Sequence, residues 1–213
     1  MKKIALLSLC SAFIAPALVA ETAKLEPTTI TGPVHFSLGN KGPLKVMGPT
    51  KLKKMNVESL DIMGSLDFDY LKVSGNSKIM GPVEGENGQF AAIEVTGPFK
   101  VEKFISDQFN VTGPTTLKKS QIKGDADIIG PFFAEDSSFQ KIVMTMDKAE
   151  LKDSTSKAIY VRKNNPEKVQ KLKLKGKTVI DGTIEFESGK GVVKADKDVV
   201  IKGEIKGAEL KRK

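Results

Sequence analysis

The side chains best suited to acid–base chemistry in this sequence are carboxylates that lie two residues apart. They include Asp67 with Asp69, Glu84 with Glu86, and Asp125 with Asp127. A pair at this spacing could flank a glycosidic bond or bind calcium weakly. Alternating charges are also typical of the solvent-facing side of a strand, and we expect that role for these pairs. A carbohydrate-active enzyme that uses Asp67 and Asp69 therefore stands as the most remote functional hypothesis.

Nucleophilic and metal-binding side chains are scarce. The sequence holds one histidine, His35, and one cysteine, Cys10. His35 lies between two apolar residues of an alternating stretch, so we expect its imidazole on the surface, with no second histidine to help it bind a metal. The phosphate-binding Gly-x-x-x-x-Gly-Lys-Ser/Thr and nucleophilic Gly-x-Ser-x-Gly motifs do not occur in the sequence. These observations predict a protein that is not an enzyme and has no metal and no cofactor.

A four-residue signature recurs seven times between positions 30 and 131: an aliphatic residue, a variable residue, glycine and then proline, which Ser65 replaces once. A fixed short period is typical of a solenoid, in which each repeat forms one turn. We interpret the Gly-Pro step as a structural corner, because glycine accepts backbone angles closed to other residues and proline fixes φ. The signature glycines are 16 or 17 residues apart, at Gly32, Gly48, Gly64, Gly81, Gly97, Gly113 and Gly130.

The apolar residues of each repeat fall into pairs two residues apart. Examples are Val34 with Phe36 and Leu71 with Val73. This spacing is the period of a strand and not of a helix. The pattern predicts an all-β, single-domain parallel β-helix (β-solenoid) with three-sided turns of about 16 residues. We expect Gly-Pro-cornered repeats over residues 21–161, a polar loop or short helix over 162–171, and basic terminal turns of the same solenoid over 172–213.

One outward position of the repeat is less polar than the others. The residue immediately before each signature glycine is, in order, Thr31, Met47, Met63, Met80, Thr96, Thr112 and Ile129. Stacked turns would align these side chains, and exposed soft apolar patches often mark docking surfaces. We therefore predict a partner-docking row formed by Met47, Met63, Met80 and Ile129. The alternatives are that the corner turns these side chains inward or that residues 162–171 cover them.

Residues 1–20 have the layout of a secretory signal peptide. A Met-Lys-Lys start precedes an apolar run from Ile4 to Ala20, and the chain turns polar at Glu21. The run contains Pro16 and is short for a membrane span. We expect cleavage of this segment, no membrane span in the mature chain, and export to the periplasm or cell envelope of a bacterium.

Positive charge is concentrated towards the C-terminus. Residues 144–213 hold 18 Lys and Arg against 11 Asp and Glu, whereas residues 21–143 hold 14 against 15. A basic surface on an exported protein suits an anionic glycan, and lysines without interleaved aromatic residues disfavour nucleic acid. Lysines that alternate with apolar residues, as in Leu172-Lys-Leu-Lys-Gly-Lys177, are also typical of a solvated strand face. We prefer that second interpretation.

Two segments of the C-terminal region resemble a known family. Ile180-Asp-Gly-Thr-Ile184 and Val200-Ile-Lys-Gly-Glu-Ile-Lys-Gly207 resemble the turns of bactofilins, polymer-forming β-solenoids. Bactofilins do not carry a signal peptide and do not usually carry a Gly-Pro corner. The resemblance implies the solenoid fold, and with export it leads us to expect a non-enzymatic structural scaffold of the cell envelope whose faces bind protein partners or a second copy. A binding module for anionic envelope polysaccharide or lipopolysaccharide is the alternative.

Overall fold

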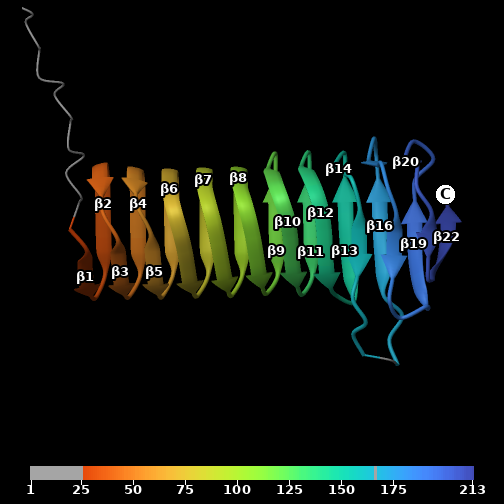
Figure 1. Ribbon diagram of the computed structural model, residues 1–213, viewed down its shortest axis with the longest axis horizontal. Coiled ribbons are helices and arrows are strands. Elements are labelled where there is room, and N and C mark those ends of the chain that lie inside the picture. The colour runs from red at the N-terminus through yellow and green to blue at the C-terminus, as the bar shows by residue number, and fades with distance from the viewer. Residues whose placement is uncertain (1–25, 166) are drawn as a thin grey trace, which may run out of the picture.

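The computed structural model describes residues 26–165 and 167–213 of the chain. In these residues all regular structure is β: 22 strands pair in parallel and wind into a β-solenoid of about eleven turns. Figure 1 shows the turns stacked into a straight rod, with the C-terminus at one end. The all-β, parallel β-helix fold predicted from the repeats is therefore confirmed. The expected signal peptide, residues 1–20, lies outside the described residues.

A strand is short where a corner interrupts the hydrogen bonding between neighbouring turns, and long where this hydrogen bonding continues through the corner. In chain order they are β1 (Thr28–Thr31), β2 (Val34–Lys41), β3 (Leu44–Met47), β4 (Thr50–Val57), β5 (Leu60–Met63), β6 (Leu66–Met80), β7 (Val83–Thr96), β8 (Phe99–Thr112), β9 (Thr115–Lys118), β10 (Gln121–Ile129), β11 (Phe132–Glu135), β12 (Ser138–Thr145), β13 (Lys148–Lys152), β14 (Thr155–Ser156), β15 (Ile159–Val161), β16 (Lys171–Lys175), β17 (Val179–Ile180), β18 (Ile184–Phe186), β19 (Gly191–Ala195), β20 (Val200–Ile201), β21 (Ile205–Lys206) and β22 (Ala208–Arg212).

Each turn contributes one segment to each of three faces. We call the first face the stack of segments that precede the signature glycines, among them β1, β3 and β5. The second face follows the Gly-Pro corner and includes β9, β11, β13, β16, β19 and β22. The third face includes β14, β17 and β20. Strands such as β6 pass through the corners and contribute to more than one face.

The core is one continuous column along the rod. Each strand pairs with its counterpart one turn later, as Leu44 does with Leu60, so alternate side chains of every turn point into the same interior. Five phenylalanines fill its middle, and their ring centroids lie 5.2–6.0 Å apart; they are Phe68, Phe90, Phe99, Phe104 and Phe109. Gly85 and Gly88 make room for this cluster, because a β-carbon at either position would lie under 3 Å from the ring of Phe68.

The signature glycines form a column of their own at the corner between the first and second faces. Their φ angles are positive, between 111° and 151°. A β-carbon at Gly48 would lie 2.5 Å from the carbonyl oxygen of Gly32, and the same overlap recurs at each later glycine of the column. The amide of Gly48 meanwhile donates to the carbonyl of Met63 at 2.9 Å. Glycine is therefore required both by the backbone angle and by the close stacking of successive turns.

The corner between the second and third faces uses left-handed residues that are not glycine. Each has φ between 48° and 60°, a conformation that L-residues adopt infrequently. The sequence has no signal for this corner, because its residue types vary freely; they are Leu38, Lys54, Tyr70, Asn87, Lys103, Lys119, Asp136 and Asp153.

A ladder of buried hydroxyls lies beside that corner in the later turns. The amide of Ser120 donates to Oγ of Ser137 at 3.1 Å, and the amide of Ser137 donates to Oγ of Ser154 at 3.1 Å. Thr178 continues the ladder at 3.3 Å from the amide of Ser154. Each serine hydroxyl in turn donates to the carbonyl two residues before it, at 2.7–2.8 Å. The ladder satisfies buried backbone groups that the turn itself leaves unpaired.

Residues 162–170 leave the stack between β15 and β16 (Figure 1) and contain no strand or helix where they are described. Arg162 anchors the start of this loop through two hydrogen bonds of 2.7 Å to the carboxylate of Asp127. Gln170 anchors its end by donating to the carbonyls of Met146 and Arg162. Among the described residues, no helix is long and apolar enough to cross a bilayer.

Candidate interaction faces

The first face carries an exposed column of methionines. The register pairs Met47 with Met63 and Met63 with Met80, so the three side chains lie on consecutive turns. They are 46–51 % exposed, which means that the corner does not turn them inward and that no described residue covers them. Ile129 is 46 % exposed in the same column, separated from Met80 by the two turns that contribute threonines. The structure therefore brings the three methionines together and leaves Ile129 apart.

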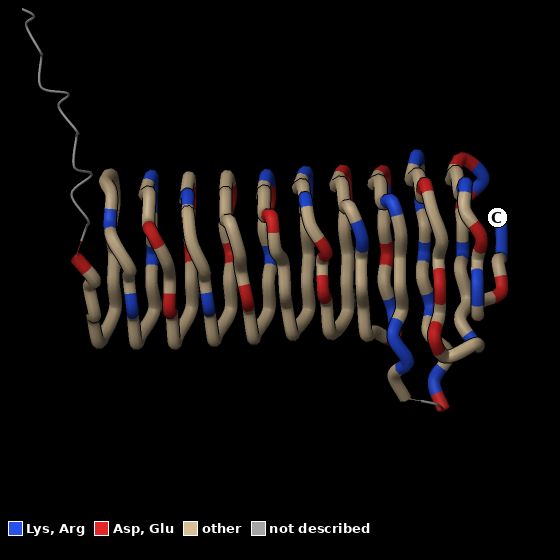
Figure 2. Tube along the Cα trace, viewed as in Figure 1, with Lys and Arg blue, Asp and Glu red and all other residues tan. Residues whose placement is uncertain are grey.

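A column of alternating charges runs beside the methionines on the same face. It reads Lys45, Asp61, Lys78 and Glu94 over four consecutive turns. Lys45 contacts Asp61 at 3.1 Å and Lys78 contacts Glu94 at 3.6 Å. Figure 2 shows positive and negative residues alternating along the rod in these turns. Such exposed ion pairs add little to the stability of the fold. The column nevertheless has a fixed order of positive and negative side chains along the face.

Four of the paired carboxylates come together on the second face. The register places Asp67 beside Glu84 and Asp69 beside Glu86. They border an open hollow of about 500 Å³. Lys51 and Lys100 flank the group, with Nζ–carboxylate distances of 2.7 Å to Asp67 and 2.6 Å to Glu84.

Two of these carboxylates, Asp67 and Glu84, take part in ion pairs that run along the rod. The hydrogen bond to Asp67 raises the pKa of Lys51, and that to Glu84 raises the pKa of Lys100. The third pair lies apart on the first face, where Asp125 contacts Lys141 at 3.7 Å and Asp127 binds Arg162. Within the described residues no group of three or more His, Cys, Asp or Glu side chains has a metal-binding arrangement.

The single histidine lies at the N-terminal end of the second face. His35 points outward next to Lys51 of the following turn, and its side chain is exposed. No carboxylate lies within ion-pair distance of it among the described residues. Among the described residues the imidazole therefore lacks a carboxylate that would orient it.

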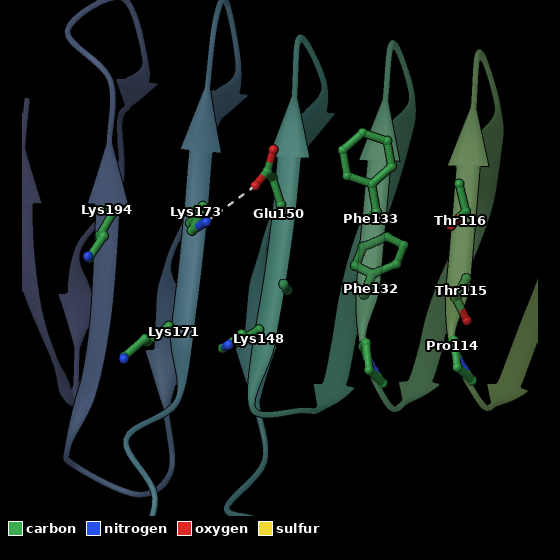
Figure 3. A pocket seen from close by; sticks show the side chains of 12 residues that line it. Pro114, Thr115, Thr116, Phe132, Phe133, Lys148, Glu150, Lys171, Lys173 and Lys194 are labelled. Atoms are coloured by element: carbon green, nitrogen blue, oxygen red, sulfur yellow. Dashed lines mark ion pairs between the residues drawn. The ribbon is translucent and has the colours of Figure 1, made fainter.

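The other end of the second face holds a hollow of about 490 Å³ that the sequence did not predict. Phe133 borders it, and four lysines line it: Lys148, Lys171, Lys173 and Lys194. Figure 3 shows these side chains on successive parallel strands, with Lys173 paired to Glu150 at 3.7 Å.

The sequence signal for this hollow is the pair of consecutive aromatics in β11. Alternation along a strand sends one ring inward and the next outward, so Phe132 is buried whereas Phe133 faces the solvent side.

Comparison with known proteins adds no relative to this description. No family model, no curated protein and no solved structure matches the chain. The assignment to the β-solenoids therefore depends on the period of the sequence and on the register of the strands.

Proposed function

We propose that the protein is a non-enzymatic structural scaffold of the bacterial cell envelope, a rigid rod that associates through its first face. The observation that carries this proposal is the exposed column of Met47, Met63 and Met80 beside the alternating charges. Exposed apolar side chains in a row gain free energy when a second surface removes them from water. The neighbouring charges decide which surface that is.

The order of the charges favours a second copy of the same chain. We consider two rods packed first face to first face about a two-fold axis that lies in the interface, perpendicular to the rods and between the turns of Asp61 and Lys78. This operation places the charge column on itself with its order reversed. Lys45 then faces Glu94 and Asp61 faces Lys78, each of these contacts occurring twice. The methionine column also meets itself, with Met63 opposite Met80.

The extent of this contact sets the expected affinity. An axis between the third and fourth turns lets about six turns of each rod overlap, a length on the order of 30 Å at the spacing of parallel strands. An interface one strand segment wide and that long lies at the small end of specific protein–protein contacts. We therefore expect a weak, concentration-dependent dimer, suited to the lateral association of rods at a high local concentration.

Two features of the sequence support the cellular part of the proposal. The layout of residues 1–20 favours export, and the likeness of the C-terminal turns to bactofilins favours a scaffold. Cell fractionation followed by N-terminal sequencing tests the location. Recovery of the protein in the cytoplasm with residues 1–20 still attached would contradict a role in the envelope.

Sedimentation equilibrium of the exported protein tests the association. Lys78→Glu places a carboxylate opposite Asp61 at two symmetric points, and we expect the dissociation constant of the dimer to rise about tenfold. Adding Asp61→Lys to the same chain restores opposite charges across the axis and should restore the dimer. Lys72→Glu makes the same charge change on the third face, where Lys72 pairs in register with Asn56 and Gln89, and should leave association unchanged.

The apolar part of the contact has its own test. Met63→Lys should weaken the dimer, whereas Ile105→Lys, an equivalent change on the third face, should not. A wild-type protein that stays monomeric at every concentration would refute association through the first face. Equal effects of the first-face and third-face substitutions would refute the proposed surface.

A further inference from the structure

The lysines at the C-terminal end of the second face depart from the alternation of charge that most of the rod follows, as the carboxylates around Asp67 and Glu84 also do. Elsewhere charged neighbours on consecutive turns are mostly opposite in sign, as Lys51 and Asp67 are. In β16, β19 and β22 the register instead stacks Lys173 on Lys194 and Lys194 on Lys211. Like charges directly opposite each other on paired strands are destabilising. A column that keeps them side by side is therefore a candidate for a function that needs them.

A second column of like charges lies beside the first. Lys148 of β13 pairs in register with Lys171 of β16. Neither of these lysines, nor Lys194, forms an ion pair with any residue that the structure describes. The carboxylate of Glu150 is the one negative charge in the hollow, and it is shared between Lys173 and Lys175. The hollow therefore has an excess of positive charge that the protein itself does not neutralise.

We propose that this hollow binds an acidic polysaccharide, with one sugar ring stacked on Phe133 and anionic groups of the following sugars on Lys171, Lys173 and Lys194. The site lies on the second face, so it is independent of the association proposed for the first face, and either can fail alone.

The geometry matches a repeating polyanion. Lysines on consecutive turns lie about 4.8 Å apart, the spacing of paired strands, which is close to the length of one sugar residue in an extended chain. A polymer that runs along the rod from Phe133 first passes Glu150, whose charge is paired with Lys173 and Lys175, and then presents anionic groups to the lysines of β16 and β19. The ring of Phe133 offers a flat apolar surface at the edge of the lysines, where the apolar face of a sugar can pack. Ring and amines together distinguish an acidic sugar chain from a simple anion.

Two other polyanions fit less well. Single-stranded nucleic acid is usually held by several aromatic rings on which successive bases stack, and the hollow presents one outward ring. An anionic lipid surface favours apolar side chains that insert beside the basic ones. Lys148, Lys171 and Lys173 are exposed, whereas Phe133, the outward ring of the hollow, is half-buried and so is poorly placed to insert into a bilayer.

Isothermal titration calorimetry with polygalacturonate tests the site, and fully methyl-esterified polygalacturonate serves as the uncharged ligand with the same backbone. Lys171→Gln combined with Lys194→Gln should weaken binding about tenfold. The matched control is Lys157→Gln combined with Lys197→Gln, which removes the same charge at exposed corners outside this hollow. Phe133→Ala should weaken binding by about tenfold as well, the loss that removal of one stacking platform produces elsewhere.

Each outcome decides the proposal. Binding of the acidic polymer in preference to its ester, lost in both hollow variants and kept in the control, supports the site. Equal losses in the hollow and control variants would show a response to net charge alone and overturn it. Tighter binding of a single-stranded oligonucleotide or of phosphatidylglycerol vesicles, titrated in parallel, would overturn it in favour of those ligands. Absence of binding to polygalacturonate by the wild-type protein would overturn it outright.

Discussion

Gly64→Ala and Ser65→Pro, two substitutions at adjacent positions of one corner, should change stability in opposite directions. A β-carbon at position 64 would lie 2.4 Å from the carbonyl oxygen of Gly48, and the backbone there has φ of 150°. A side chain in this Gly-only region costs about 1–3 kcal/mol in backbone strain. The overlap forces two turns apart and costs about 1–3 kcal/mol more, as overpacking does in other cores. We therefore expect Gly64→Ala to destabilise the protein by about 2–6 kcal/mol.

Ser65→Pro should instead stabilise the protein. The other six signature corners have proline at this position, so the ring is compatible with the corner. The structure gives no hydrogen bond donated by the amide of Ser65, so proline removes none that is described. The gain comes from fewer conformations of the unfolded chain and amounts to about 0.4–1 kcal/mol.

Urea unfolding followed by circular dichroism measures both effects. At an m-value of about 2 kcal/mol/M, the midpoint of Gly64→Ala should fall by about 1–3 M. Gly32→Ala separates the two terms, because Gly32 has a positive φ but begins the column and its β-carbon would meet no atom within 4 Å. Its loss should reflect strain alone. Equal losses in Gly64→Ala and Gly32→Ala would refute the argument from stacking of the glycines.

Three further predictions concern the hydroxyl ladder, the loop and the surface ion pairs. Ser137→Ala leaves the buried amide of Ser120 without a partner and should lower the free energy of unfolding in urea by about 1–3 kcal/mol. The control variant Ser138→Ala removes a hydroxyl with no described hydrogen bond and should change the free energy of unfolding by less than about 0.5 kcal/mol. Arg162→Met removes both hydrogen bonds to Asp127 and should speed proteolysis within residues 162–170. The control variant Lys141→Met loses a single longer contact to Asp125, and its rate of cleavage in the same loop should equal that of the wild-type protein. The hydrogen bond from Lys152 lowers the pKa of Glu135, so this pair stabilises the fold above the ordinary carboxyl pKa and loses that contribution as pH falls through the lowered pKa. Lys152→Met should therefore raise the pKa of Glu135, which an NMR titration measures. An unchanged pKa would show that the pair does not form in solution.

The fold was predictable because its two requirements repeat in the sequence. Glycine recurs at a corner where no other residue fits, and apolar residues recur two apart wherever a strand faces the core. The phase of these repeats also identified the position of Met47, Met63 and Met80, although their exposed fractions and their register on consecutive turns came from the structure. The second corner could not be predicted, because its left-handed residues have no common type and the stack holds them in place.

The hollow at Phe133 was missed for a different reason. Its lysines come from three strands whose register depends on the lengths of the intervening turns, and the excursion of residues 162–170 lies between β15 and β16. A fixed period of 16 therefore cannot place Lys148 beside Lys171, which are 23 positions apart. Ser120, Ser137 and Ser154 illustrate the same limit, since a polar residue at an inward position has no meaning until its neighbours one turn away are known.

The solenoid separates the demands of folding from those of recognition. Side chains at inward and corner positions must fit against the turns above and below, so few residue types are accepted there, among them glycine, phenylalanine and serine. Outward columns meet only water and their neighbours above and below, and opposite charges on consecutive turns are the arrangement of lowest energy for them. On the first face the charges alternate in sign over the first turns. This face is therefore complementary in charge to a second copy of itself that runs in the opposite direction. The second face gathers carboxylates around Asp67 and lysines around Lys173, which makes it complementary to a polyanion at one end alone. The departures from alternation, more than the repeats themselves, therefore indicate where a ligand other than the protein supplies the missing charge.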